Sequence, residues 1–151
     1  MDPKAVLRGN APAKIDDKGR LKVPNSFRAL IQEAHGREVF VTSLNGDNVR
    51  IYPMPVWQGI EQKLAAMPST HPARLRFLDR VNYYGQVAEI DVQGRVLIHA
   101  RLRDGAGTTG EVDVLGLLTY LDVWSHERFA ARIAGNPLTD DDLNALSAAG
   151  I

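Results

Sequence analysis

The sequence contains no cysteine among its 151 residues. This absence excludes a disulfide framework, a thiol nucleophile and thiolate metal ligands. No apolar run approaches the roughly 20 residues that a membrane-spanning helix requires, and residues 1–8 lack the long apolar stretch of a secretory signal. We therefore expect a cytoplasmic protein with no membrane partner.

Groups that carry catalysis or hold cofactors are also sparse. The four histidines are scattered, with no pair spaced four residues apart, so the sequence predicts no metal site. Residues 105–110 match the pattern G-x-G-x-x-G, but a short helix is expected before them and a strand after them, the reverse of the order in dinucleotide-binding folds. We expect no cofactor, no small-molecule substrate and no enzymatic activity.

The net charge of the chain is zero, but the charges are unevenly distributed. Residues 1–37 carry eight lysines and arginines against four acidic residues, a net charge of +4. Residues 111–151 carry two basic residues against seven acidic ones, a net charge of −5. A neutral chain of this kind can still present one basic surface to a polyanion such as nucleic acid.

The most informative feature is an internal repeat. Residues 13–23 read AKIDDKGRLKV, and residues 88–98 read AEIDVQGRVLI. The alignment extends to a pair of equivalent arginines, Arg28 and Arg103. Each copy is about 45 residues long, which is too short to bury a stable core by itself. The sequence therefore predicts one domain made of two interlocked halves.

Apolar periodicity and turn residues predict a mixed α+β fold. In the first half we expect two strands, a short helix capped by Asn25, and a hairpin, at residues 13–16, 21–23, 25–31, 38–43 and 49–52. Two linker helices should follow at residues 53–67 and 73–81. The second half should repeat the series at residues 86–91, 95–99, 100–104, 111–115 and 120–124. Helices at 127–133, capped by Ser125, and after Thr139 should close the chain.

Each copy is centred on a turn of the form Asp-x-x-Gly-Arg. In one interpretation Asp16 and Asp91 are structural, accepting hydrogen bonds from turn N–H groups or pairing with the arginine four residues on. Gly19 and Gly94 then supply a backbone conformation that other residues resist. In a second interpretation the two aspartates form a catalytic carboxylate dyad, although the neighbouring arginines would hold both of them ionised.

Basic side chains surround the first turn. Arg20 lies among Lys14, Lys18 and Lys22, at spacings that place them on an exposed face of a hairpin. A two-stranded ribbon is one of the shapes that enter the major groove of DNA, where arginine pairs with guanine. The second copy lacks the lysines and leaves Arg95 alone, so we expect the first copy to read DNA and the second to be mainly structural. The alternative is an assembly protein whose basic face is incidental.

Five separated segments together resemble the MraZ family: residues 8–10 (RGN), 16–24 (DDKGRLKVP), 50–57 (RIYPMPVW), 80–85 (RVNYYG) and 91–98 (DVQGRVLI). The resemblance covers residues 7–132 and implies two SpoVT/AbrB-like swapped-hairpin repeats, interlocked into one small β-barrel with flanking helices. It also implies a bacterial transcriptional regulator that binds short tandem promoter repeats as a ring-like oligomer. Such regulators typically repress the division and cell wall gene cluster that includes their own gene.

We divide the chain into an N-terminal arm (1–9), a first repeat (10–56), linker helices (57–84), a second repeat (85–128), and a C-terminal helix with an acidic tail (129–151). The family's Asp-x-x-x-Arg signature falls on Asp16/Arg20 and Asp91/Arg95. The residues expected to bind double-stranded DNA are Arg20, Lys18, Lys22, Lys14, Arg8 and Arg95. Two features depart from the family pattern, namely the residues before Arg8 and His99 in place of the usual proline. We predict a nucleoid-associated, homo-oligomeric repressor without a cofactor.

Overall fold

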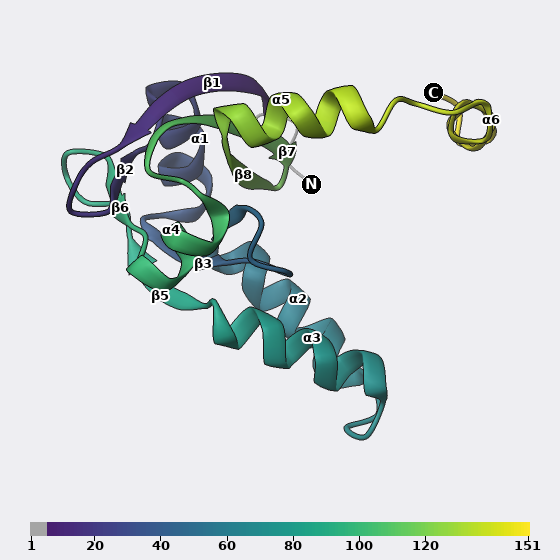
Figure 1. Ribbon diagram of the computed structural model, residues 1–151. Coiled ribbons are helices and arrows are strands. Elements are labelled where there is room, and N and C mark those ends of the chain that lie inside the picture. The colour runs from purple at the N-terminus through teal and green to yellow at the C-terminus, as the bar shows by residue number, and fades with distance from the viewer. Residues whose placement is uncertain (1–5) are drawn as a thin grey trace.

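The computed structural model describes residues 6–151, which form eight β-strands and six α-helices (Figure 1). The first half contains β1 (Leu7–Ile15), β2 (Arg20–Lys22), α1 (Asn25–His35), β3 (Glu38–Thr42) and β4 (Val49–Pro53). Two helices, α2 (Met54–Ala66) and α3 (Pro72–Tyr83), lead to the second half. That half contains β5 (Gln86–Glu89), β6 (Arg95–Leu97), α4 (Ala100–Ala106), β7 (Gly110–Leu118) and β8 (Tyr120–Ser125). The last helices are α5 (His126–Gly135) and α6 (Asp140–Ala148).

All eight strands belong to one antiparallel sheet, in the order β5-β3-β4-β8-β7-β1-β2-β6. The outermost strands, β5 and β6, are consecutive in the chain and are joined by the turn at residues 90–94. The sheet therefore curls into a nearly closed barrel. Each strand of one half has a counterpart in the other, and exchanging the halves leaves the strand order around the barrel unchanged.

The two halves exchange strands with each other. β1 of the first half pairs with β7 of the second, from Leu7 opposite Leu118 to Ile15 opposite Gly110. In the same way β5 of the second half pairs with β3 of the first, and β2 pairs with β6. The expected mixed α+β barrel of two interlocked halves is confirmed.

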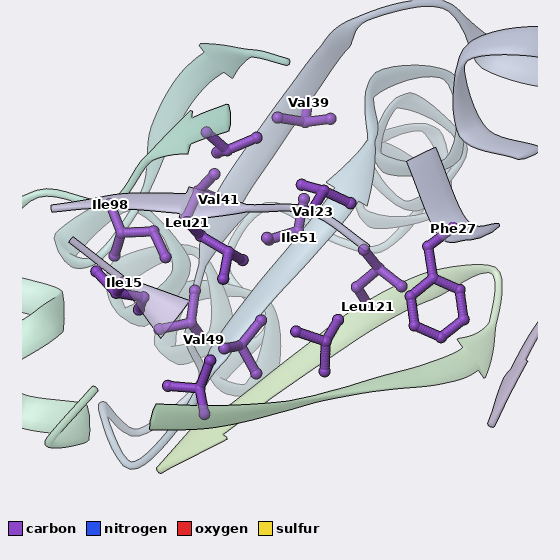
Figure 2. Packing of buried hydrophobic residues seen from close by; sticks show 14 of the residues in the cluster. Ile15, Leu21, Val23, Phe27, Val39, Val41, Val49, Ile51, Ile98 and Leu121 are labelled. Carbon is purple, nitrogen blue, oxygen red and sulfur yellow. The ribbon is translucent and has the colours of Figure 1, made fainter. Parts of the chain in front are cut away.

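The core fills the barrel with aliphatic side chains from both halves. Leu21, Val41 and Ile51 have no exposed surface, and Figure 2 shows them converging on one space with their neighbours from other strands. A second cluster, made of Phe40, Tyr52, Trp57 and Val81, packs α2 and α3 against β3 and β4. The linker helices are therefore attached to the barrel by aromatic packing, which makes them part of the same domain. No helix within residues 6–151 combines the length and apolar character that crossing a membrane requires.

The two halves also touch at their glycine turns. The carbonyl oxygen of Gly94 accepts a hydrogen bond from the backbone N–H of Val23 at 2.9 Å, and that of Gly19 accepts one from Ile98 at 2.8 Å. Both glycines have a positive φ, +84° at Gly19 and +80° at Gly94, a region that side chains disfavour. Each half therefore completes the turn of the other.

The first strand is longer than predicted. Residues 1–9 were expected to form an arm and the strand to begin at Ala13, but β1 begins at Leu7. Residues 1–5 of that arm lie outside the described residues. The cause is tertiary, because β7 provides a partner for all nine residues of β1, whereas the local sequence Gly9-Asn10 favours a turn.

The cap of α1 also differs from the prediction. Asn25 is the first helical residue and makes no capping bond. Pro24 precedes the helix instead, and its carbonyl oxygen accepts hydrogen bonds from the N–H groups of Phe27 and Arg28. The predictions for the last two helices are confirmed, since Ser125 caps α5 and Thr139 forms a capping box with Asp142 in α6.

The close approach at Gly19 leads to a stability prediction. A Cβ at Gly19 would lie 2.6 Å from the guanidinium of Arg103 and 2.8 Å from the carbonyl oxygen of Ile98, whereas one at Gly110, also with positive φ, would meet nothing within 4 Å. Gly110→Ala should cost about 1–2 kcal/mol for its conformation. Gly19→Ala should cost about 1–3 kcal/mol more, because overlap is added to strain. Urea unfolding measures both, and equal losses would contradict the contact between the halves.

The strand exchange leads to a second prediction. Residues 1–56 expressed alone should be unfolded, or should form a dimer that reproduces the barrel, because β1 and β3 would lose their partners β7 and β5. Circular dichroism and light scattering on a sizing column distinguish these results. A stable folded monomer from this fragment would show that the halves are independent.

Candidate nucleic-acid interface

Five of the six basic side chains singled out in the sequence lie on or near a ribbon formed by β2 and β6, one strand from each half. Figure 1 shows these two strands beside each other. The ribbon pairs Arg20 with Leu97, Leu21 with Val96, and Lys22 with Arg95. Since successive side chains on a strand point to opposite faces, the buried Leu21 and Val96 face the core. The outward surface, called here the ribbon face, consists of Arg20, Lys22, Arg95 and Leu97.

The first turn fixes the direction of Arg20. One carboxylate oxygen of Asp16 accepts hydrogen bonds from the backbone N–H groups of Lys18 and Arg20, at 3.0 and 2.9 Å. The other accepts the Nε–H of Arg20 at 2.9 Å. The backbone N–H of Arg20 is the main reason that the pKa of Asp16 lies below its ordinary value, and the Arg20 side chain also lowers this pKa. Arg20 is thus held through Nε, which leaves its two terminal nitrogens for a ligand.

The second turn keeps the backbone geometry but not the ion pair. Asp91 accepts hydrogen bonds from the backbone N–H groups of Gln93 and Arg95, and the bond from Arg95 is the main cause of the lowered pKa of Asp91. The Arg95 side chain donates instead to Oε1 of Gln93 at 2.8 Å. Of the two structural roles expected for the aspartates, Asp91 therefore takes only the bonding to turn N–H groups, whereas Asp16 takes both, because Gln93 stands where Lys18 stands in the first turn.

The ribbon face brings like charges together. Lys22 and Arg95 are direct cross-strand partners, and like charges in this position destabilise a sheet. The positive charge of Arg20 also reaches Asp91 in the opposite half, where it contributes to the lowered pKa. Arg95 is therefore not isolated, as the sequence of its own repeat suggested, but lies beside the basic residues of the first repeat.

The remaining predicted residues lie at different distances from this face. Lys18 is exposed at the tip of the first turn. Lys14 is exposed on β1, opposite Glu111, and lines a surface pocket of about 330 Å³ together with Lys22. Arg8 lies six residues before Lys14 on the same strand, roughly 20 Å away at about 3.3 Å per residue. The structure thus gathers five of the six predicted residues and leaves Arg8 apart.

Two further arginines support the turns from the opposite half. The Arg28 guanidinium donates to the carbonyl oxygen of Val92 at 2.9 Å and lies over Gly94, while the Arg103 guanidinium lies over Gly19. The sequence carried a signal for this pair, since they occupy equivalent positions in the repeat. Their role could not be derived from it, because each arginine acts on the turn of the other half.

The arrangement does not match a carboxylate dyad or a metal centre. A dyad that shares a proton needs one carboxyl group with a raised pKa, but the pKa values of Asp16 and Asp91 are both lowered. Within residues 6–151, no group of three or more His, Cys, Asp or Glu side chains is placed to hold a metal ion. The ribbon face has instead the geometry of a binding surface for an anion.

Comparisons with known proteins cover almost the whole chain. Residues 6–80 and 86–146 match the sequence model of a family described as "MraZ protein, putative antitoxin-like". A protein of Acidobacterium capsulatum named Transcriptional regulator MraZ is 47% identical over 146 residues, which cover 97% of this chain and 100% of that protein. Proteins of the same name are 48% identical in Koribacter versatilis, over 97% of this chain and all of that protein, and 32% identical in Escherichia coli O127:H6, over 92% and 95%.

The lowered pKa values of the two turn aspartates predict acid sensitivity. Such groups contribute stability above their unfolded pKa, near 3.8, and this stability is lost as the pH falls through their lower folded pKa. The double variant Asp16→Asn, Asp91→Asn should be less stable than the unsubstituted protein at about pH 5, because it lacks both carboxylates. Between about pH 5 and pH 2 its free energy of unfolding should fall less than that of the unsubstituted protein. Urea midpoints measured across this range test the prediction, and equal pH dependence in the two proteins would refute it.

Proposed function

The chain belongs to the MraZ family of transcriptional regulators, and we propose that it binds promoter DNA through its ribbon face. The observation that carries this proposal is the cross-strand pair Lys22 and Arg95, with Arg20 beside them and no acidic side chain on that face. Apposed like charges destabilise a sheet, and the turn carboxylates of Asp16 and Asp91 lie beside Arg20 and Arg95 but do not pair with Lys22. A DNA phosphate backbone would supply further negative charge.

The ribbon has dimensions suited to a major groove. Its two strands lie about 5 Å apart and each paired segment is about 10 Å long, within a groove about 12 Å wide. Arg20, held by Asp16 through Nε, presents its terminal nitrogens to the N7 and O6 acceptors of guanine. Leu97 is 45% exposed at the same level and offers an apolar contact for a thymine methyl group.

The other basic residues contact phosphates. Lys18 and Lys22 are exposed on either side of Arg20, where they neutralise the two strands bordering the groove, and Arg95 adds a contact from the second half. Lys14 contributes less, because Glu111 lies opposite it across the ladder. Arg8 contacts only DNA that continues beyond the ribbon.

One ribbon provides few phosphate contacts, so several copies act together. We infer that the protein assembles into a ring-like homo-oligomer and occupies short tandem repeats in the promoter, where each ribbon takes one repeat and linkage raises the overall affinity. Occupation of the promoter represses the division and cell wall gene cluster, including the protein's own gene, as the family resemblance implies. The protein then works in the cytoplasm on the nucleoid, without a cofactor and without catalysis.

The alternative is an assembly protein whose basic face has no function. DNA-binding measurements distinguish it from the proposed regulator. Such a protein would form the same oligomer but would bind its own upstream region no better than unrelated DNA. The observation against it is the unbalanced charge on the ribbon face, which assembly alone does not explain.

Substitution of Arg20 tests the reading of bases. Arg20→Ala should weaken binding to the protein's own upstream region by about 1–3 kcal/mol, and Arg20→Lys should retain affinity for unrelated DNA but lose discrimination, because lysine cannot pair bidentately. Mobility shifts with specific and unrelated DNA measure both effects. Unchanged discrimination in Arg20→Ala would remove the central residue of the proposal.

Substitution of Lys22 tests the phosphate contact. Lys22→Ala should weaken binding to all sequences alike and should reduce the slope of log affinity against log salt by about 0.9. Lys63→Ala is the matched control, because Lys63 is exposed on α2, outside the ribbon. A salt slope that changes equally in the two variants would show that the ribbon has no special role.

A further inference from the structure

The C-terminal arm, residues 133–151, contributes nothing to the core of its own chain. Every residue in it is exposed except Leu146, which is half-buried. Ile133, Leu138, Leu143 and Ile151 expose 49–83% of their surface. Figure 1 shows α6 standing away from the rest of the molecule.

The arm is nevertheless built to hold a helix. Thr139 and Asp142 form a capping box, and Leu138 and Leu143 occupy the positions of a hydrophobic staple. A helix of nine residues is marginal in water even when well capped. A capped helix with unburied leucines therefore requires a surface on which to dock.

The exposed side of α3 is partly apolar and carries a net positive charge. Leu75 and Tyr83 are 48% and 57% exposed, and Arg76 and Arg80 lie beside them, one helical turn apart. Asp79 lies between them on the same side, and Arg101 lies over the Tyr83 ring at 4.7 Å, so three arginines outweigh one aspartate there. Like charges at this spacing destabilise a helix. Within residues 6–151 the only ion pairs are Arg20–Asp16 and His126–Asp113, so neither the arginines of α3 nor the aspartates of α6 have a charged partner.

The charges of the two surfaces are opposite. The arm has three aspartates and no basic residue, while α3 has three arginines and one aspartate. We propose that α6 of one copy docks on the exposed side of α3 in a neighbouring copy, with Leu138, Leu143 and Leu146 packing on Leu75 and Tyr83. The acidic first turn of α6, with Asp140 nearest, then faces Arg76 and Arg80. This inference rests on the assembly in the proposed function and names the surfaces that form it.

The placement of the two elements explains why the contact joins different copies. The α2–α3 pair and the C-terminal helices leave the barrel in different directions (Figure 1). A contact between an arm and an unlike surface is heterologous, so that each copy donates one arm and receives another, and the series closes into a ring or continues as a filament. The ribbon face takes no part in it and stays available to DNA.

A charge-exchange experiment on the full chain tests the proposal. One variant carries Asp140→Lys and Asp141→Lys, and the other carries Arg76→Glu and Arg80→Glu. Each alone sets like charges against each other and should lose the oligomer on a sizing column with light scattering. Mixing the two should restore it, because lysine arms then meet glutamate helices and aspartate arms meet arginine helices.

Each outcome decides the question. The Arg76→Glu, Arg80→Glu variant has an unaltered arm, so retention of its oligomer would overturn the proposal even if lysines weakened α6 in the other variant. Failure of the mixture to reassemble would overturn it as well. If the oligomer returned only when all four substitutions were made in the same chain, the arm would be docking on α3 of its own molecule, which would also overturn the proposal. Loss of assembly with single-repeat binding intact is the expected result, whereas absence of specific DNA binding in the unsubstituted protein would refute the proposed function and leave the docking result standing.

Discussion

The reciprocal contact between the two glycine turns is the constraint on which the rest of the structure depends. Gly19 and Gly94 each accept a backbone hydrogen bond from the opposite half, and each lies under an arginine of that half. This contact sets the register of β2 against β6. The register buries Leu21 and turns Arg20 outward, so the core and the ribbon face are determined together.

The internal repeat was sufficient to predict the class of fold and the interlocking of the halves. Repeats of about 45 residues cannot bury a core alone, so the two copies had to share one. That the halves meet at the turns was seen only in the structure. The strand β1 was underestimated because its extension depends on β7, more than ninety residues later, and no local pattern encodes such a partner. Asn25 was misjudged for the opposite reason, since its local preference for capping was outweighed by the backbone of Pro24.

The candidate site was predictable residue by residue but not as a surface. The sequence indicated Arg20 and its lysines from their spacing within one repeat. It could not indicate that Arg95 faces Lys22, because that neighbour comes from the other repeat. The sequence also did not predict the difference between the two turns. The Arg95 side chain bonds to Gln93, whereas the Arg20 side chain bonds to Asp16.

The two halves place different side chains on the ribbon face, so this surface is asymmetric. On the ribbon face Arg20 lies opposite Leu97, whereas Lys22 lies opposite Arg95. A dimer of identical repeats would carry the same side chains on both sides of its axis and would therefore suit a palindrome. When the two halves belong to one chain, their sequences can differ, and the two ends of the ribbon face are then chemically distinct. If the ribbon face binds DNA as proposed, it would accept a site in one orientation only, and sites that all point the same way would set successive subunits facing the same way along the helix.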